Sequence, residues 1–254
     1  MVDPQDVREL IRNEAQGMSC ELRLPDRGLT ELPSEISQLT RHVRLDLSYN
    51  QLSKIPDALT QLSNLLFLDL ASNQIREIPN SIAHMSNLQS LTLSQNLIRE
   101  IPEAIAHLSY LDSLSLCRNQ ICEIPESLSQ LTQLTFLLLH HNQIREIPDS
   151  LGQLTHLTSL SLSHNQIRVI PDALGQLSQL TSLSLSNNQI CEIPDALAQL
   201  HNLQFLALKG NQISELPDFL DDLPQLRLLS VQGNPITAVP DWIDAKSNRK
   251  VLLS

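Results

Sequence analysis

Apolar and polar positions along the chain repeat with a period of 23 residues. Leucine lies five residues before each marker asparagine, and leucine or, once, valine lies three residues before it. Leucine or isoleucine follows two residues after the asparagine, and proline follows six after. The marker asparagines are Asn50, Asn73, Asn96, Asn119, Asn142, Asn165, Asn188, Asn211 and Asn234. A degenerate copy with Arg27 at the asparagine position precedes them, so the pattern predicts ten repeats.

Each repeat predicts one strand and one helical turn. The two leucines before the asparagine alternate with polar residues, which is typical of a short strand with one buried face. Proline fixes φ, and apolar residues three apart follow it, which predicts one turn of α- or 3-10 helix. Stacked repeats would pair their strands into a parallel sheet. In the turn between strand and proline, asparagine can donate to and accept from backbone groups that would otherwise stay unpaired.

The repeat LxxLxLxxNxIxxIPxxLxxLxx resembles that of the leucine-rich repeat family over residues 20–245. Its Ile-Pro form is similar to the intracellular Ras-group and Roco-type repeats. The resemblance implies an α/β fold, a curved right-handed solenoid with a parallel sheet on its concave face and short helical or 3-10 turns on its convex face. It also implies that other proteins bind on the concave sheet.

The pattern divides the chain into an N-terminal helical cap (1–19), ten repeats (20–245) and a C-terminal end (246–254). A helix is predicted over residues 4–15, with Asp3 as N-cap and Pro4 at the first helical position. Leu252 lies 23 residues after Leu229, which predicts a closing strand over 251–253. Either Trp242 covers that end of the stack, or the chain is part of something longer.

Composition excludes several classes of function. The 254 residues carry a formal net charge of −11, which argues against binding to nucleic-acid phosphates or to an anionic membrane surface. No secretory signal and no apolar run long enough to span a membrane is recognised. The four cysteines form no CxxC pair and indicate free thiols in a reducing compartment, hence the cytoplasm, or the host cytosol for a secreted effector.

Catalytic motifs are absent from the sequence, which contains no GxxxxGK[ST], GxGxxG, GxSxG or HExxH. We therefore predict a protein without enzymatic activity and without a cofactor. The column spacing could bring Cys117, His140, His141 and His164 together at the rim where the strands end, as a Cys/His metal site. The competing and favoured interpretation is that these are solvated histidines that face a partner.

Acidic residues form two columns, one before each Ile-Pro step and one after its proline. The second column would lie at helix N-termini, where the peptide dipole favours negative charge. Arginines beside the first column, such as Arg145 next to Glu146, would offset the charge of the glutamates. The alternative interpretation is an acidic stripe for a basic partner.

The outward strand positions predict the binding surface. Many of them carry serine or threonine, which contribute little binding energy, and exceptions to this pattern are the candidate contact residues. These exceptions are Asp46, Phe67, Asp69, Phe136, Leu138, His140, Phe205, Lys209 and Leu228. The alternative is that the phenylalanines only shield the sheet, as remnants of the duplication of a three-repeat cassette.

We therefore predict a non-enzymatic protein–protein interaction module that binds a folded partner on its concave sheet, in intracellular signalling. The family resemblance implies a small GTPase or another signalling protein as partner. Two alternatives stay open, which are a repeat arm of a larger or oligomeric assembly and a bacterial effector that acts on a host protein.

Overall fold

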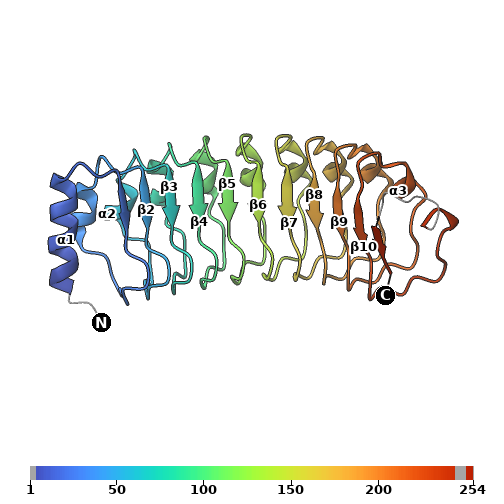
Figure 1. Ribbon diagram of the computed structural model, residues 1–254, viewed down its shortest axis with the longest axis horizontal. Helices are drawn as coiled ribbons and strands as arrows, with labels where there is room; N and C mark the ends of the chain where they lie inside the picture. Colours follow the sequence, from blue (N-terminus) through green and yellow to red (C-terminus); the bar gives the residue numbers. More distant parts are fainter. Residues whose placement is uncertain (1–3, 244–249, 254) are drawn as a thin grey trace. The chain divides into compact units, whose positions relative to one another are not determined.

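The computed structural model describes residues 4–243 and 250–253. The chain forms two compact units, of which unit 1 ends at Ile121 and unit 2 begins at Cys122. In each unit, strands and short helical turns alternate along the chain, with the strands side by side (Figure 1). The described residues contain eleven strands, one for each of the ten predicted repeats and one for the predicted closing strand. The predicted α/β repeat architecture is confirmed.

Unit 1 contains the helix α1 (Pro4–Gln16), five strands and four short helices. Its strands are β1 (Glu21–Arg23), β2 (Arg44–Asp46), β3 (Phe67–Asp69), β4 (Ser90–Thr92) and β5 (Ser113–Ser115). Its short helices are η1 (Ser34–Gln38), α2 (Asp57–Thr60), η2 (Asn80–His84) and η3 (Glu103–His107). Each strand pairs in parallel with the next, in a register of 23 residues.

Unit 2 repeats this arrangement. Its strands are β6 (Phe136–Leu138), β7 (Ser159–Ser161), β8 (Ser182–Ser184), β9 (Phe205–Ala207), β10 (Leu228–Ser230) and β11 (Lys250–Leu252). Its short helices are η4 (Glu126–Gln130), η5 (Asp149–Gln153), η6 (Asp172–Gln176), η7 (Asp195–Gln199), α3 (Phe219–Asp222) and η8 (Asp241–Ile243). The strands again pair in parallel with their neighbours.

Leucine and isoleucine fill the interior of the coils. From β1 to β10 the central leucine of each strand is buried and its two neighbours are half-buried or exposed. Leu160, at the centre of β7, is fully buried, and so is Ile167, two residues after the asparagine of the same repeat. Burial of such a side chain contributes about 1.5–3 kcal/mol, so the repeated leucines are the main source of stability.

The repeated asparagine joins neighbouring coils through its side chain. In unit 2, Asn165 Nδ2 donates to the carbonyl oxygens of Leu139 at 3.1 Å, Leu162 at 2.9 Å and Ser163 at 3.4 Å. Its Oδ1 accepts from the amide of Ile144 at 3.0 Å. The same arrangement recurs in both units, for example at Asn96 and Asn188. The predicted role of the asparagine is confirmed.

The residue before each repeated asparagine adopts the left-handed backbone conformation, with φ between +54° and +68°. This holds for all ten repeats, including the first, where Asp26 precedes Arg27. Two of the ten are glycines, Gly210 and Gly233, and the other eight carry side chains. The chain therefore leaves the strand by the same turn in every coil, whichever residue occupies the position.

Proline starts the short helices as predicted. Pro148 has φ −68° and ψ 145°, and its carbonyl oxygen accepts from the amide of Leu151 at 3.0 Å. An acidic residue occupies the first turn of most of these helices, such as Asp149 in η5 and Asp172 in η6.

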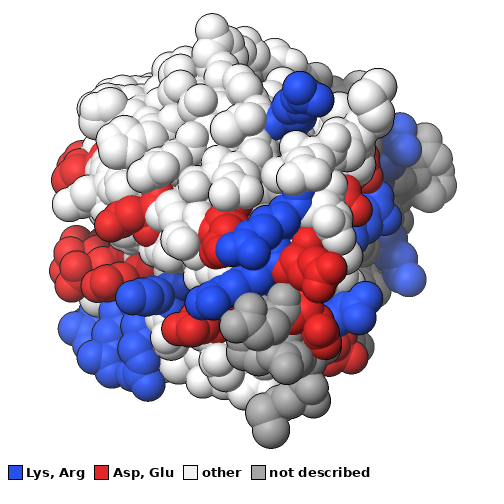
Figure 2. Space-filling model, turned by 90° about the vertical axis from the view of Figure 1, so that its left-hand side faces the viewer, with Lys and Arg blue, Asp and Glu red and all other residues white. Residues whose placement is uncertain are grey.

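Helix α1 covers the first coil of unit 1 and agrees with the predicted cap. Val7 and Ile11 are buried on its inner side, and α1 packs against η1. Arg12 and Glu35 form an ion pair at 2.7 Å between these two helices. Acidic and basic side chains are interspersed over this end of unit 1 (Figure 2). The proposed N-cap Asp3 lies outside the described residues.

The closing strand is present, but its predicted register is wrong. In β11, Val251 and not Leu252 lies opposite Leu229, and Leu252 lies opposite Ser230. The last coil is therefore one residue shorter than the 23-residue period. Because side chains alternate between the two faces of a strand, this shift moves Leu252 out of the inward leucine column.

His42 is an exception inside the core of unit 1. It occupies a position that is leucine in every later repeat, beginning with Leu65 and Leu88. Its side chain is buried, and within the described part of the chain neither ring nitrogen has a hydrogen-bond partner. Burial lowers the pKa of His42 below its ordinary value, although the carboxylate of Glu14 on α1 acts in the opposite direction.

Replacing Asn188 by alanine should destabilise unit 2 by about 3 kcal/mol or more, since each buried backbone group left unpaired costs about 1–3 kcal/mol. Asn187→Ala is the adjacent control, because the half-buried amide of Asn187 hydrogen-bonds to the ring of His164, and alanine at this left-handed position should cost no more than about 1–2 kcal/mol. Urea denaturation of both variants measures the difference. Equal stability losses would contradict the coil-bridging role of Asn188.

The pKa of His42 also predicts a pH dependence of stability. An unfolded histidine titrates near pH 6.5, whereas folded His42 titrates lower, so below about pH 6.5 the unfolded state binds more protons. The free energy of unfolding should therefore fall as the pH decreases below about 6.5, until the folded pKa is passed. His42→Leu should remove this contribution and stabilise unit 1. Urea midpoints at about pH 8 and about pH 5.5 test it, with the exposed His84→Gln as control. An unchanged pH dependence in His42→Leu would refute the assignment.

Candidate functional site

The outward positions of the strands form one face in each unit, which we call the strand face. All nine residues predicted from the sequence lie on or beside it. Unit 1 carries Asp46, Phe67 and Asp69. Unit 2 carries Phe136, Leu138, His140, Phe205, Lys209 and Leu228.

The strand face of unit 1 carries more charge than the sequence prediction assigned to it. The guanidinium of Arg44 lies over the ring of Phe67, 4.4 Å from its centroid, as a cation–π pair. Glu21 accepts from Arg23 at 3.0 Å and lies 3.6 Å from Arg44. Sequence reasoning missed these three residues, although they occupy the columns of Phe67 and Asp46 in the preceding repeats.

Asp46 and Asp69 are direct neighbours on β2 and β3 and line a shallow depression of about 230 Å³ with Phe67. Asp46 accepts from the amide and the hydroxyl of Ser48, and Asp69 accepts from the amide of Ala71 at 2.9 Å. Burial raises the pKa of Asp69, the hydrogen bond from Ala71 opposes this, and the negative charge of Asp46 raises the pKa further. Arg23 and Arg44 line the same depression, so two guanidinium groups lie beside its two carboxylates.

The strand face of unit 2 carries two exposed phenylalanines on a background of serine. Phe136 is 46% exposed and Phe205 is 43% exposed. Ser159 and Ser182 separate them in the same row of the sheet, and Leu228 extends the row beyond Phe205. With parallel strands about 4.8 Å apart, the two rings are about 15 Å from each other. Leu138 and Leu228 beside them are half-buried.

Histidines lie where the strands of unit 2 end. The rings of His141 and His164 stack with centroids 4.0 Å apart and planes 9° apart, and His140 meets His141 edge-on at 5.7 Å. Nδ1 of His140 lies 3.2 Å from the hydroxyl of Ser161. Lys209 is exposed and has no ion-pair partner in the part of the chain that the structure describes.

This arrangement contradicts the metal-site interpretation of Cys117, His140, His141 and His164. Stacked, nearly parallel imidazoles direct their lone pairs side by side, whereas zinc needs them to converge at about 2.0–2.1 Å. Cys117 belongs to unit 1, and its sulfur lies 3.9 Å from the hydroxyl of Ser115. Across residues 4–243 and 250–253, no group of three or more His, Cys, Asp or Glu side chains is arranged to hold a metal ion.

The arginines beside the glutamate column hydrogen-bond to glutamines of the next coil. Nε of Arg145 donates to Gln166 of the next coil at 3.4 Å, and Nε of Arg168 donates to Gln189 at 3.2 Å. Consecutive residues of an extended chain point in opposite directions, so Arg145 turns away from the adjacent Glu146 and toward the neighbouring coil.

The helices described in the structure include none that is long and apolar enough to cross a membrane. None of the four cysteines forms a disulfide; Cys20, Cys122 and Cys191 are exposed and Cys117 is half-buried.

Three family descriptions match the chain. The leucine-rich repeat region family matches residues 88–183, and two further leucine-rich repeat families match residues 43–98 and 160–249. No curated protein matches the sequence. The narrower resemblance to Ras-group and Roco-type repeats stays a prediction.

Solved structures of leucine-rich repeat proteins are similar to this chain over nearly its whole length. A leucine-rich repeat protein of Leptospira interrogans is 31% identical, with 96% of this chain and 68% of that chain covered and a TM-score of 0.77. The ectodomain of the Arabidopsis thaliana receptor kinase GASSHO1/SCHENGEN3, in complex with CASPARIAN STRIP INTEGRITY FACTOR 2, is 33% identical, with coverages of 92% and 29% and a TM-score of 0.84. The plant peptide hormone receptor RGFR1, in complex with RGF2, is 29% identical, with coverages of 97% and 41% and a TM-score of 0.83. This chain thus spans less than half of each plant receptor chain.

The strand face of unit 1 yields a prediction for Asp69. Asp46→Asn removes the neighbouring negative charge, so the pKa of Asp69 should decrease toward its usual range while burial keeps it above that range. Carboxyl carbon NMR titration measures the change. Asp57→Asn, on helix α2, is the control and should leave Asp69 unaffected. A pKa of Asp69 that is the same in Asp46→Asn would show that the two carboxylates do not interact.

Proposed function

The chain belongs to the leucine-rich repeat family, and we propose that it is a non-enzymatic protein-binding module whose strand face contacts a folded partner. The observation that carries this proposal is the exposure of Phe136 and Phe205 on the strand face of unit 2. Aromatic side chains that are exposed in the free protein and centred in a polar surface are typical binding hot spots.

The residues around the phenylalanines support this assignment. Serine fills the positions between the two rings, so the face is flat there and accessible to a partner. Leu138 and Leu228 extend the apolar surface at either ring, while His140 and Lys209 supply polar groups at the strand ends. A partner that contacts both phenylalanines must span about 15 Å, which favours a folded protein over a small ligand.

Similar structures agree with a protein-binding role. Two of the plant receptors were solved in complex with CASPARIAN STRIP INTEGRITY FACTOR 2 and RGF2. The proposal has two finer parts. The form of the repeat suggests a signalling partner such as a small GTPase, and the four cysteines suggest a cytoplasmic location. The alternatives of an assembly arm and of a bacterial effector stay predictions.

The Phe136→Glu/Phe205→Glu double variant should reduce binding of the natural partner at least about tenfold, because it removes two apolar anchors and places charges in a desolvated interface. Affinity capture from a lysate with quantitative mass spectrometry compares it with the wild-type protein. Tyr110→Glu is the matched control, since this aromatic residue is 62% exposed and lies outside the strands.

A protein that is captured by the wild type and by Tyr110→Glu, but lost in the double variant, supports the strand face as the binding surface. Equal capture by all three would show that recognition lies elsewhere on the chain. Urea denaturation of each variant verifies that it is folded.

A further inference from the structure

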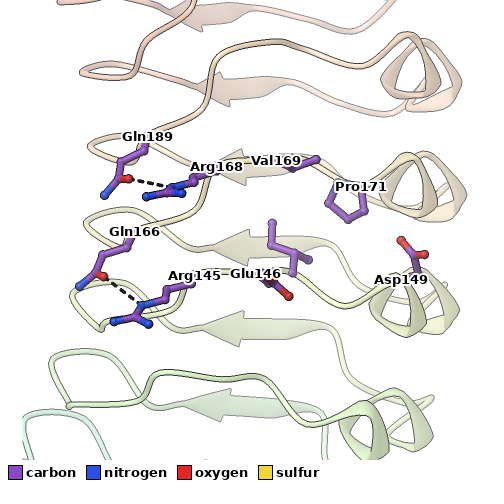
Figure 3. Close-up of a pocket in the computed structure, with 9 residues that line it drawn as sticks. Arg145, Glu146, Asp149, Gln166, Arg168, Val169, Pro171 and Gln189 are labelled. Carbon is purple, nitrogen blue, oxygen red and sulfur yellow. Dashed lines mark hydrogen bonds between the residues drawn. The ribbon is translucent and has the colours of Figure 1, made fainter.

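A groove of about 610 Å³ lies on the flank of unit 2, between the asparagine turns and the short helices (Figure 3). Two successive coils form it. Arg145 and Arg168 border it at one end, and Asp149 lies at the other (Figure 3). Between them lie the apolar side chains of Val169 and Pro171 and the carboxylate of Glu146, which belongs to the coil of Arg145 (Figure 3). We call this the flank groove. Its volume is in the range of about 300–1,000 Å³ that is usual for ligand sites.

The two guanidinium groups of the flank groove are held in place by the neighbouring coils. Gln166 and Gln189 accept from Nε of Arg145 and Arg168 (Figure 3). The backbone amide of each glutamine donates at 2.8 Å to an isoleucine carbonyl of the preceding coil, so the glutamines themselves are fixed. The outer nitrogens of both arginines have no hydrogen-bond or ion-pair partner among the described residues.

An acidic group would complete this arrangement. Arg145 and Arg168 occupy the same position in consecutive coils, about 5 Å apart, so their like charges repel each other. A carboxylate placed between them can accept from both guanidiniums through short, charge-assisted hydrogen bonds. The pair is a local cationic site on a chain with a net charge of −11.

Val169 breaks the acidic column at this point. In unit 2 the same position is glutamate in the coils on either side, at Glu146 and Glu192. Glu146 lines the groove beside Arg145, so with Val169 in the next coil the groove holds one carboxylate of this column instead of two, which lowers the repulsion of an incoming carboxylate. Val169 instead is 61% exposed, so it offers an apolar contact directly beside the arginine pair.

We propose that the flank groove binds an extended segment of another protein, in which an acidic side chain and an apolar side chain lie two residues apart. The acidic side chain binds between Arg145 and Arg168, and the apolar side chain packs on Val169 and Pro171. Residues two apart in an extended chain point to the same side, which matches the succession of charged and apolar surface in the groove. Asp149 repels negative charge at the far end of the groove, so the acidic side chain of the segment is favoured at the arginine end.

Unit 1 provides an internal comparison. Its corresponding groove of about 550 Å³ is lined by Arg76 and Arg99, but it keeps glutamate at both column positions, Glu77 and Glu100. Glu100 takes the place of Val169. The arginines are therefore repeated in the two units, whereas the exposed apolar contact is found in the flank groove and not in its unit 1 counterpart.

The test uses the acetylated and amidated peptide Gly-Ser-Glu-Ser-Leu-Ser-Gly, titrated into the full chain labelled at valine methyl groups and at arginine Nε. We expect saturable NMR shifts at Val169, Arg145 and Arg168, while the methyl signals of the exposed Val239 stay unchanged. The same peptide with glutamine in place of glutamate should bind at least about tenfold more weakly.

Three variants make the test specific. Arg145→Ala/Arg168→Ala and Val169→Glu should each weaken binding at least about tenfold, whereas Arg76→Ala/Arg99→Ala should change it by less than about twofold. Phe136→Glu/Phe205→Glu should leave peptide binding unchanged, so the flank groove and the strand face are tested independently.

Several results would overturn the proposal. These are the absence of saturable shifts at Val169 up to millimolar peptide, equal binding of the glutamine peptide, and equal affinity in Arg145→Ala/Arg168→Ala. Binding of free acetate with the affinity of the peptide would also overturn it, because it would show a simple anion site without an apolar contact.

Discussion

The whole structure depends on the hydrogen bonds of one asparagine side chain per coil. Asn165, for example, accepts from the amide of Ile144 in the preceding coil and donates to the carbonyl oxygens of Leu162 in its own coil and Leu139 in the preceding one. These backbone groups lie at a turn inside the stack, where water cannot replace their partners. A left-handed residue lies directly before the asparagine in nine repeats and before Arg27 in the first. A side chain in that conformation costs about 1–2 kcal/mol, yet eight of the ten repeats carry one there. The same turn is kept in all ten repeats although the residue at the turn varies, so the stacking of the coils and not the identity of that residue sets its conformation.

Leucine, isoleucine and asparagine account for the fold. A residue that differs from the usual residue at its position in the repeat therefore indicates a role other than folding. Phe136 and Phe205 depart from a column of serines, Val169 from a column of glutamates, and His42 from a column of leucines. The first two departures expose apolar surface at a cost to solubility, and the third buries a titratable ring without a hydrogen-bond partner. None of these residues improves the packing of its coil. A binding role explains the first two departures, and a weakening of unit 1 in acid is the consequence of the third.

The sequence predicted the strands, the short helices and their register because the 23-residue spacing carries all of that information. It failed at β11, where Val251 takes the place predicted for Leu252. It also failed where the side-chain rotamer decides the contact. Column spacing brings His141 and His164 together correctly, but it cannot distinguish stacked rings from a ligand set. Likewise, the sequence pattern did not reveal that Arg145 hydrogen-bonds to Gln166 of the next coil.

The two candidate surfaces of unit 2 are linked through the same coils. Strand β7 contributes Ser159 to the row between the phenylalanines, and the same repeat contributes Arg168 and Val169 to the flank groove. Asn165 lies between these two segments in the chain. Its side chain hydrogen-bonds to the amide of Ile144 and to the carbonyl oxygen of Leu139, both in the preceding coil. The spacing between neighbouring coils is therefore the same for both surfaces. A substitution at an outward position alters one surface alone, whereas a change in the asparagine ladder would alter the spacing of the phenylalanine row and of the arginine pair together. Two binding surfaces with different chemistry can thus evolve independently on a shared backbone, as long as the ladder that spaces them is kept.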